Sequence, residues 1–515
     1  MAHMRRSLRV LGLAGGAALA AASLLIPAAP AAAPHALLVG SYHGIPGPYR
    51  TIQAAVAAAK PGDTILVGPG VYHEATTSED GVLITTPGVR LRGMDRNGVI
   101  LDGTLPTSPR PCSSDAAAQS PTPNGRNGIE VKANGVYVEN LTVCNFLSSA
   151  GAENGNEVWW NGGDGSGKMG MSTYWGNYLT ATSSFFAGSD APMAQYGIFV
   201  SNAGGPGSVK QSYANNMGDS AFYVGACPDC NGVLDGVHAE HSALGYSGTN
   251  SGGHLSITNS EWDDNKAGIV PNSLNNDDAP PPQDGACPNG GTGPTGTHSC
   301  TVIENNFVHD NNDPNVPGSG IAGSAPVGTG IEVAGGRNDT VLSNRVEHNG
   351  AWGIVVHDFP DTETPPPISN CQGGTQVPGA VCYFPAFGNE VATNALRDNG
   401  FFGNPTNSDL AAATMAHDPG NCFHGNTDPN GVTSDPPDIQ NPAVMGTCGV
   451  PNQGDTTVLV AELVCASSVF GTCPGVPGAT YPRTTAVTMP AAPPQATMPD
   501  PCAGVPPNAW CGVTH

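Results

Sequence analysis

The sequence has few basic residues and, beyond its first 33 residues, no long hydrophobic run. Lysine and arginine together number 18 against 42 acidic residues, and the formal charge is −24. A chain this acidic cannot neutralise a nucleic-acid backbone, which excludes nucleic acid as a partner. It also repels a polyanionic glycan unless a cation bridges the two. No stretch after residue 33 is long and apolar enough to span a membrane, so we expect no transmembrane anchor.

The first 33 residues have the composition of an export signal. Three arginines precede an apolar run from Val10 to Ile26, and small residues follow it. This pattern is typical of a secretory signal peptide that is removed from the mature protein. The adjacent Arg5 and Arg6 leave Sec and Tat export open. We therefore expect a secreted, extracellular protein, and we expect a monomer.

Fourteen cysteines in an exported chain predict disulfides. Their spacing favours seven local pairs: Cys112–Cys144, Cys227–Cys230, Cys287–Cys300, Cys371–Cys382, Cys422–Cys448, Cys465–Cys473 and Cys502–Cys511. The sequence CPDC at 227–230 could instead be a redox pair or half of a zinc site. The chain has no second CxxC to complete such a site, which favours the structural disulfide.

A short motif recurs at intervals of 23 or 24 residues in two runs, one from Gly197 to Gly268 and the other from Gly330 to Gly353. It reads GIFV, AFYV, GYSG, GIVP, GIEV and GIVV and begins at Gly197, Ala221, Gly245, Gly268, Gly330 and Gly353. Self-similarity at this period indicates a solenoid. The residues alternate as in strands, and a 3.6-residue helical pattern is missing. We predict an all-β, right-handed parallel β-helix of about ten turns, each with three short strands, that rises ~4.8 Å per turn.

Side-chain alternation predicts which residues of the motif fill the interior. The inward set is Ile198, Val200, Phe222, Val224, Ile331, Val333, Ile354 and Val356. A polar turn precedes each motif, and we align Asn216, His241, Asn265 and Asn349 at its equivalent positions. Asparagines stacked at one position can hydrogen-bond along the column and satisfy buried polar groups. By this alignment His241 replaces a ladder asparagine and points inward.

Residues 51–74 have the pattern of a cap for the first turn of the solenoid. Ile52, Ala55, Val56 and Ala59 form one apolar helical face, which ends at Pro61. This segment resembles the N-terminal cap of the right-handed parallel β-helix (pectin-lyase-like) superfamily. The sequence GVYHE, from Gly70 to Glu74, is similar to a GxYxE element of pectin methylesterases. The other catalytic signatures of those esterases, of pectate lyases and of polygalacturonases are missing, so the resemblance implies a fold and does not name a reaction.

The solenoid pattern sets the domain boundaries. We expect the signal peptide at 1–33, the β-helix domain at 34–436 and a proline-rich tail at 437–515. Two short cysteine loops hold the tail, which we expect to wrap partly over the last turn and to be partly flexible.

Long insertions mark the working face of a solenoid. Three stand out, at 147–168, 272–300 and 357–387, and the second and third follow equivalent strands. We expect them to leave the same edge and to wall a groove.

Outward positions next to the inward residues predict the floor of this groove. Candidate catalytic residues are Glu332, His357, Asp358 and Arg337. Candidate substrate-binding residues are Phe199, Tyr223 and Asn272, with Trp159 and Trp160 as a flap. Aromatic faces beside carboxylates suit sugars, because rings stack on C–H faces and acids bond hydroxyl groups.

Acidic residues also gather in the polar turns. Glu240, Asp264 and Asp310 would lie on adjacent turns, ~5 Å apart. This spacing suits calcium, and it is near the separation of a retaining glycosidase pair. A transition-metal site at His238, His241 and Glu240 is a further alternative, which the inward His241 disfavours.

Three functions remain open. The first is a secreted carbohydrate-active enzyme, in which Glu332 and Asp358 act as general acid and base. Five lysines in the mature chain disfavour a calcium-free lyase. The second is a non-catalytic protein that binds a polysaccharide or cell-surface glycan. The third is an extracytoplasmic metal-handling protein.

Overall fold

The computed structural model describes residues 34–512 apart from several gaps. The gaps are 76, 78, 150–153, 165, 190–191, 276–280, 295, 362–370, 378–380, 415–419, 446–456, 468–472 and 474. The chain divides into 1–33 and 34–515, and only the second unit contains described residues. The predicted signal peptide and Cys448 therefore lie outside the described residues.

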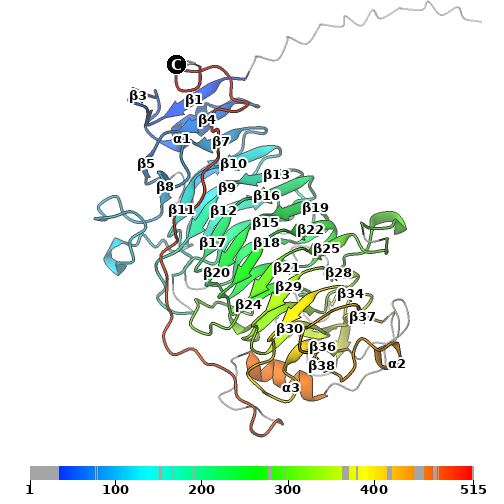
Figure 1. Cartoon of the computed structure of the whole chain (residues 1–515). Helices are drawn as coiled ribbons and strands as arrows, with labels where there is room; N and C mark the ends of the chain where they lie inside the picture. Colours follow the sequence, from blue (N-terminus) through cyan, green and yellow to red (C-terminus); the bar gives the residue numbers. More distant parts are fainter. Residues whose placement is uncertain are drawn as a thin grey trace, which may run out of the picture. The chain divides into compact units, whose positions relative to one another are not determined.

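The unit is a right-handed parallel β-helix of three parallel sheets, as predicted (Figure 1). The chain visits sheets I, II and III in turn, and they contain 12, 10 and 11 strands. Sheet I contains β1 (Ala36–Val39), β4 (Thr64–Val67), β7 (Arg90–Gly93), β10 (Val136–Glu139), β13 (Tyr174–Asn177), β16 (Gly207–Lys210), β19 (Cys227–Asp235), β22 (Ser251–Thr258), β25 (Thr301–Glu304), β28 (Asp339–Leu342), β34 (Glu390–Ala392) and β37 (Cys422–His424).

The other two sheets follow the same order. Sheet II contains β5 (Gly70–Tyr72), β8 (Val99–Asp102), β11 (Thr142–Cys144), β14 (Thr180–Thr182), β17 (Tyr213–Asn215), β20 (His238–Glu240), β23 (Glu261–Asp263), β26 (Phe307–His309), β29 (Arg345–Glu347) and β35 (Ala395–Arg397). Sheet III contains β6 (Asp80–Ile84), β9 (Asn127–Val131), β12 (Asn156–Asn161), β15 (Tyr196–Ser201), β18 (Ser220–Gly225), β21 (Leu244–Thr249), β24 (Ala267–Asn272), β27 (Thr329–Ala334), β30 (Trp352–His357), β36 (Ser408–Ala413) and β38 (Ser434–Asp435).

Shorter elements lie outside the three sheets. A two-stranded ribbon comprises β2 (Ser41–Tyr42) and β3 (Ile45–Pro46), and a small antiparallel sheet comprises β31 (Phe359–Asp361), β32 (Thr375–Val377) and β33 (Val381–Phe384). The described helices are α1 (Ile52–Ala58), α2 (Pro442–Met445) and α3 (Thr457–Ala466) with three short 3-10 turns. No helix in the described part of the chain is long and apolar enough to cross a membrane.

Side-chain alternation fills the interior as the sequence predicts. All eight predicted inward residues of the repeated motif are buried, and they join one continuous apolar core. In sheet III the paired positions Ile198, Phe222 and Tyr246 continue through Ile269 and Ile331. Each turn therefore covers the apolar face of the turn before it, as expected of a solenoid.

Asparagine ladders stabilise two of the corners between strands. The residues in these ladders differ from the predicted alignment. One ladder joins Asn265, Asn311, Asn349 and Asn399 through side-chain hydrogen bonds of 3.1–3.2 Å. The other joins Asn306, Asn344, Asn394 and Asn426.

Two of the residues aligned with the first ladder lie elsewhere. Asn216 and His241 have left-handed backbone angles (φ 64° and 53°) and precede the ladder position by one residue. Ser242 occupies that position, where its amide donates to Asn265. The predicted alignment of His241 with the ladder was therefore wrong by one residue.

The cap helix forms as predicted, and the GVYHE element supports it. Thr51 caps the N-terminus of α1, and Ile52, Ala55 and Val56 are buried. The Glu74 carboxylate accepts the backbone amides of Ile52 (2.6 Å) and Gln53 (3.3 Å). The acid of this element therefore satisfies amide groups at a helix start, which are otherwise unpaired.

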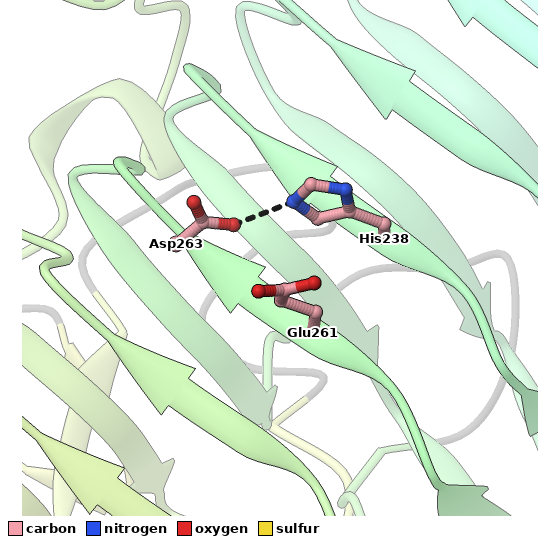
Figure 2. Close-up of side chains that lie close together, drawn as sticks. All are labelled: His238, Glu261 and Asp263. Atoms are coloured by element: carbon pink, nitrogen blue, oxygen red, sulfur yellow. Dashed lines mark hydrogen bonds and ion pairs between the residues drawn. The ribbon is translucent and has the colours of Figure 1, made fainter. Parts of the chain in front are cut away.

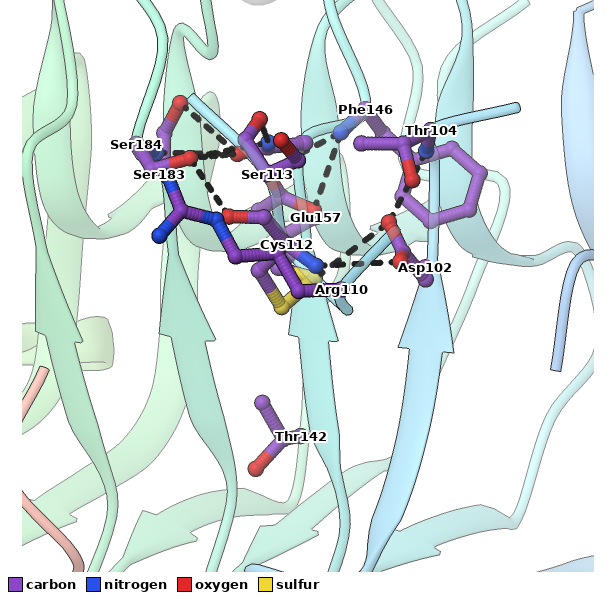
Figure 3. Close-up of a disulfide and its surroundings, with 12 residues drawn as sticks. Asp102, Thr104, Arg110, Cys112, Ser113, Thr142, Phe146, Glu157, Ser183 and Ser184 are labelled. Atoms are coloured by element: carbon purple, nitrogen blue, oxygen red, sulfur yellow. Dashed lines mark hydrogen bonds between the residues drawn. A yellow bond between two sulfur atoms is a disulfide. The ribbon is translucent and has the colours of Figure 1, made fainter. Parts of the chain in front are cut away.

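Six of the seven predicted disulfides are present, and the partner of Cys422 lies outside the described residues. Cys112–Cys144 fastens the excursion between β8 and β9 to sheet II (Figure 3). Beside it, Asp102 accepts the amides of Thr104 (2.9 Å) and Cys112 (3.0 Å). The excursion of residues 103–126 was not among the predicted insertions.

The C-terminal tail packs against the last turns of the β-helix and then runs back along it to the first turns. Leu459 and Leu463 of α3 pack in a cluster with Val355 and Ala411 of sheet III. The chain then runs back toward the first turns, where it is drawn in red (Figure 1). Trp510 packs there with Leu38, Leu66 and Met94.

Candidate functional site

The predicted outward row of sheet III exists in the predicted order. Strand pairing aligns Glu130, Trp159, Phe199, Tyr223, Ser247, Val270, Glu332 and Val355. A second row, two residues further along, contains Ser201, Thr249, Asn272, Ala334 and His357. The alternation in the sequence therefore predicted the outward positions of Phe199, Tyr223, Asn272, Glu332 and His357, but it did not predict that Trp159 shares their row.

The two tryptophans are part of this sheet and do not form a loop. Both belong to β12, so the placement of 147–168 as one long insertion was wrong. Trp159 points outward, and its indole nitrogen donates to Ser201 (2.9 Å). Trp160 is fully buried in the core. Consecutive strand residues face opposite sides of the sheet, and only one of the pair can meet a ligand.

The aromatic rings of this row cover one another. Phe199 stacks on Tyr196 (centroids 4.2 Å apart, planes at 11°) and on Trp159 (5.2 Å, 15°). Tyr223 meets the Phe199 ring edge-on at 4.8 Å. The Phe199 ring is therefore largely in contact with other aromatic rings, and its role in substrate binding stays a prediction.

The structure brings three of the predicted catalytic residues together but buries them. Glu332, His357 and Asp358 are only 5%, 6% and 7% exposed. His357 Nε2 lies 2.9 Å from Glu332 Oε1, and its Nδ1 lies 2.8 Å from the Asp358 carbonyl oxygen. Burial lowers the pKa of His357, but the hydrogen bond and charge of Glu332 outweigh it, so the pKa is raised.

Neighbouring segments cover this cluster. The Asp358 carboxylate accepts the Tyr383 hydroxyl and the Ala386 amide, both from the hairpin region after β30. On either side, α3 packs on Val355, and Ala322 and Ala325 pack on Val270. These segments and the surrounding strands leave Glu332 almost without solvent contact, and its catalytic role stays a prediction.

Arg337 and Asn272 have other described partners. The Arg337 guanidinium donates to the Gly373 and Pro385 carbonyl oxygens and stacks on Phe387. Asn272 hydrogen-bonds to Ser247 and Thr249 on the neighbouring strand. Their catalytic and binding roles stay predictions.

Sheet II presents a second set of ionisable side chains, and this set is accessible. We call it the open strip, the outward residues of β20, β23, β26 and β29: His238, Glu240, Glu261, Asp263, Phe307, His309, Arg345 and Glu347. Its ionisable side chains are 14–55% exposed. Inward Ala239, Trp262, Val308 and Val346 anchor the same strands in the core.

The C-terminal tail defines one end of the open strip. Pro490 accepts hydrogen bonds from Asn215 and Asn216 at one edge of sheet II, and Gln495 pairs with Asn97 at the other. The tail thus crosses this sheet next to β17. Thr180 and Asn215 are buried on the covered side, whereas the strands from β20 onward stay open.

Four polar side chains of the open strip lie together on the paired strands β20 and β23, and we call this four-residue cluster the square. His238 pairs with Glu261, and Glu240 pairs with Asp263, so all four face outward. His238 Nε2 lies 2.6 Å from Asp263 Oδ1 and 3.6 Å from Glu240 Oε2. Figure 2 shows His238, Asp263 and Glu261 converging from the two strands. Burial lowers the pKa of His238, but the hydrogen bond and charge of Asp263, together with the charges of Glu240 and Glu261, raise it overall.

Residues on the adjacent turns hold the square in place. The hydroxyl group of Tyr213, which lies on β17, donates a hydrogen bond to the Glu240 carboxylate. His309 Nε2 lies 3.3 Å from Glu261 Oε1 on the other side. Beyond it, the Arg345 guanidinium stacks on the Phe307 ring (4.1 Å) and binds both oxygens of Glu347 (2.7 Å each).

The predicted calcium ligands do not share one column. Glu240 pairs with Asp263 and therefore lies one position away from Asp264 and Asp310, which occupy left-handed turn positions. Asp310 instead contacts His309 (2.9 Å) and His348 (3.4 Å). Of the alternative set, His238 and Glu240 meet in the square and His241 lies outside it. The alignment failed by one residue because the turn, unlike the strand, does not keep the alternation.

Sequence reasoning missed Glu261, Phe307 and Arg345 as parts of this face. A signal existed in the strand before each turn, where HAE, EWD, FVH and RVE alternate outward, inward and outward. The predictions followed the strand after the turn, where the apolar repeat is stronger.

Comparisons with known proteins report distant likenesses in fold. No protein-family model and no curated protein matches the chain. Among solved structures, the A-module of the Azotobacter vinelandii mannuronan C-5 epimerase AlgE4 is 14% identical, with a TM-score of 0.40 over 73% of this chain and 91% of that one. An alginate lyase from Paenibacillus sp. (11%, 0.37; 78% and 97%) and the pectate lyase Pel9A (15%, 0.39; 78% and 81%) are also similar. All three resemble this chain as parallel β-helices, and the likeness carries no argument about its activity.

Proposed function

We propose that this protein is exported and binds a polysaccharide along the open strip of sheet II. One observation carries the proposal. The strip presents carboxylates, imidazoles and an arginine-backed aromatic ring on successive strands, all partly exposed. From β20 to β29 the strip extends ~14 Å at ~4.8 Å per strand. A linear row of this kind suits an extended polymer better than a compact ligand.

Its chemistry matches hydroxyl-rich ligands. Carboxylates accept hydrogen bonds from hydroxyl groups, and a neutral imidazole can both accept and donate them. Phe307 stacks on His309 (ring centroids 3.8 Å apart) and lies under Arg345, and the part of its ring that stays exposed adds apolar surface. The net charge of −24 favours a neutral polysaccharide, because an anionic one is repelled unless a cation lies between.

Affinity electrophoresis of the purified protein in gels containing neutral polysaccharides tests this function. At least one polysaccharide should retard the wild type, and Phe307→Ala should reduce the retardation. Trp175→Ala is the matched control, because it removes a half-buried ring from the outer face of sheet I. Retardation lost with Trp175→Ala and kept with Phe307→Ala would place binding on another sheet.

A second candidate function is cleavage of the bound polymer. Glu240 and Asp263 lie opposite each other on adjacent strands, and strand spacing places them near the ~5–5.5 Å separation of a retaining glycosidase pair. New reducing ends that appear with the wild type and disappear with Glu240→Gln would support this function. Retardation without any change in polymer mass would show binding alone.

A further inference from the structure

We infer that His238, Glu261 and Asp263 bind a divalent transition-metal ion of the zinc class. One nitrogen or oxygen of each residue can be chosen so that all three atoms lie within 4.8 Å of one another. The four-residue square also contains Glu240, whose Oε2 lies 3.6 Å from His238 Nε2. This inference stands on donor geometry and does not require glycan binding.

The positions of the donors follow directly from the sheet. His238 and Glu240 are two residues apart on β20, and Glu261 and Asp263 are their paired partners on β23. Side chains at such positions share one face, with ~4.8 Å between strands. Tetrahedral zinc, with bonds of ~2.0–2.2 Å, needs its donors about 3.4 Å apart. Small side-chain rotations, with the strands fixed, can bring the ligand atoms to this separation.

The charge of the square favours a cation. Among the ion pairs of the described residues, Glu240, Glu261 and Asp263 are matched only by His238 and His309. Three carboxylates around one imidazole leave excess negative charge even if that imidazole is protonated. A divalent ion bound among them would neutralise this excess.

The donor types decide which ion fits. Calcium and magnesium prefer oxygen ligands alone, whereas an imidazole with carboxylates suits zinc and its neighbours. Residues on adjacent turns already orient one ligand and its neighbour, since His309 contacts Glu261 and the Tyr213 hydroxyl donates a hydrogen bond to Glu240, the fourth residue of the square. Outer contacts of this kind hold metal ligands in position.

The test uses untagged full-length protein, because an affinity tag of histidines would itself bind metal. After treatment with a chelator, titration with ZnCl2 followed by calorimetry should give one site per chain. Co²⁺ bound at this site should show the visible absorption of a nitrogen–oxygen coordinated ion. CaCl2 should compete weakly, at a concentration at least 100-fold higher than that of Zn²⁺.

Two variants locate the site. His238→Ala should weaken Zn²⁺ binding by at least ~100-fold, since losing a ligand should cost more than losing an outer contact. Glu261→Gln should weaken it at least ~10-fold while preserving the fold, because Glu261 is half exposed. His254→Ala is the matched control. Among the described residues, His254 forms an ion pair with one carboxylate, that of Asp229 on sheet I (2.9 Å), and its loss should leave Zn²⁺ affinity unchanged.

Two results would overturn the inference. In one, the wild type binds no stoichiometric Zn²⁺ or Co²⁺. In the other, Glu261→Gln and His254→Ala have equal effects. If metal binds and no polysaccharide retards the protein, only the proposed function fails. If a polysaccharide retards the metal-free protein and no metal binds, only this inference fails.

Discussion

The outer faces of sheets II and III each join a histidine to a carboxylate across paired strands, yet their surroundings differ. In sheet II the pair is His238 and Asp263 (2.6 Å), and both side chains meet solvent. In sheet III it is His357 and Glu332 (2.9 Å), and both are more than nine-tenths buried. The same local chemistry thus belongs to an open surface on sheet II and to an internal contact on sheet III.

Segments outside the repeat cause this difference. Helix α3 and residues 322–325 pack on sheet III, whereas the described part of the tail crosses sheet II from β17 toward β8, away from the open strip. Alternation along a strand fixes which way a side chain points, and only the covering segments decide whether it meets solvent. An outward carboxylate is therefore a candidate for ligand binding only after its cover is known.

The largest predicted difference between the two faces is in stability. Glu332→Ala should lower the free energy of unfolding by about 3–5 kcal/mol, because it leaves His357 buried without its partner. Denaturant unfolding measures the change. A loss below about 1 kcal/mol would mean that Glu332 is solvated, and the predicted catalytic role of this residue would regain support.

Uncovering sheet III should have the next largest effect. Leu459 is fully buried where α3 meets Val355 and Ala411. Leu459→Ala should therefore weaken the packing of α3 on sheet III by about 2–5 kcal/mol. Hydrogen exchange should rise in α3 and in β30 and stay unchanged in β20 and β23. Equal increases in both sheets would contradict independent covering of the two faces.

The two faces should also differ in their response to pH. The pKa of His357 is raised in the folded protein, so protonation favours folding. Its contribution is complete below the ordinary histidine pKa of about 6.5 and is lost as pH rises through the folded value. The difference in unfolding free energy between wild type and His357→Gln should therefore shrink from about pH 6 upward. A difference that grows with pH would contradict the Glu332 contact.

The smallest effect is expected on the open strip. Asp263→Ala should change the free energy of unfolding by about 1 kcal/mol or less, since its partner His238 is partly exposed and ion pairs of this kind contribute little. Thermal unfolding beside Glu332→Ala gives a direct contrast. A loss as large as that of Glu332→Ala would mean that the square is a structural contact.

The regular part of this fold could be predicted because each turn repeats the same constraint. The motif starting at Gly330 and Gly353 fixed the inward residues, and strand pairing then aligned Glu332 with Val355 as expected. Six disulfides also matched, since local cysteine pairs leave few alternatives. The strand that contains Trp159 and Trp160 was not predicted, because it lacks the repeated motif that begins with glycine.

The candidate site was harder to predict because it depends on long-range packing. Nothing near Glu332 in the sequence shows that α3, more than 100 residues later, covers its neighbour Val355. The offset of Glu240 from Asp264 arises in a turn, where left-handed residues such as His241 interrupt the alternation. The local sequence pattern therefore predicts which way side chains point along a strand. It does not predict the alignment of turn residues or which segments cover a sheet.

Carboxyl labelling followed by mass spectrometry tests most directly whether sheet II is the face that meets solvent and ligand. A water-soluble carbodiimide with an amine should modify Glu261 readily and leave Glu332 unmodified in the native protein. A polysaccharide that retards the protein should then protect Glu261. Rapid labelling of Glu332, with protection by the polysaccharide there and none at Glu261, would contradict the account.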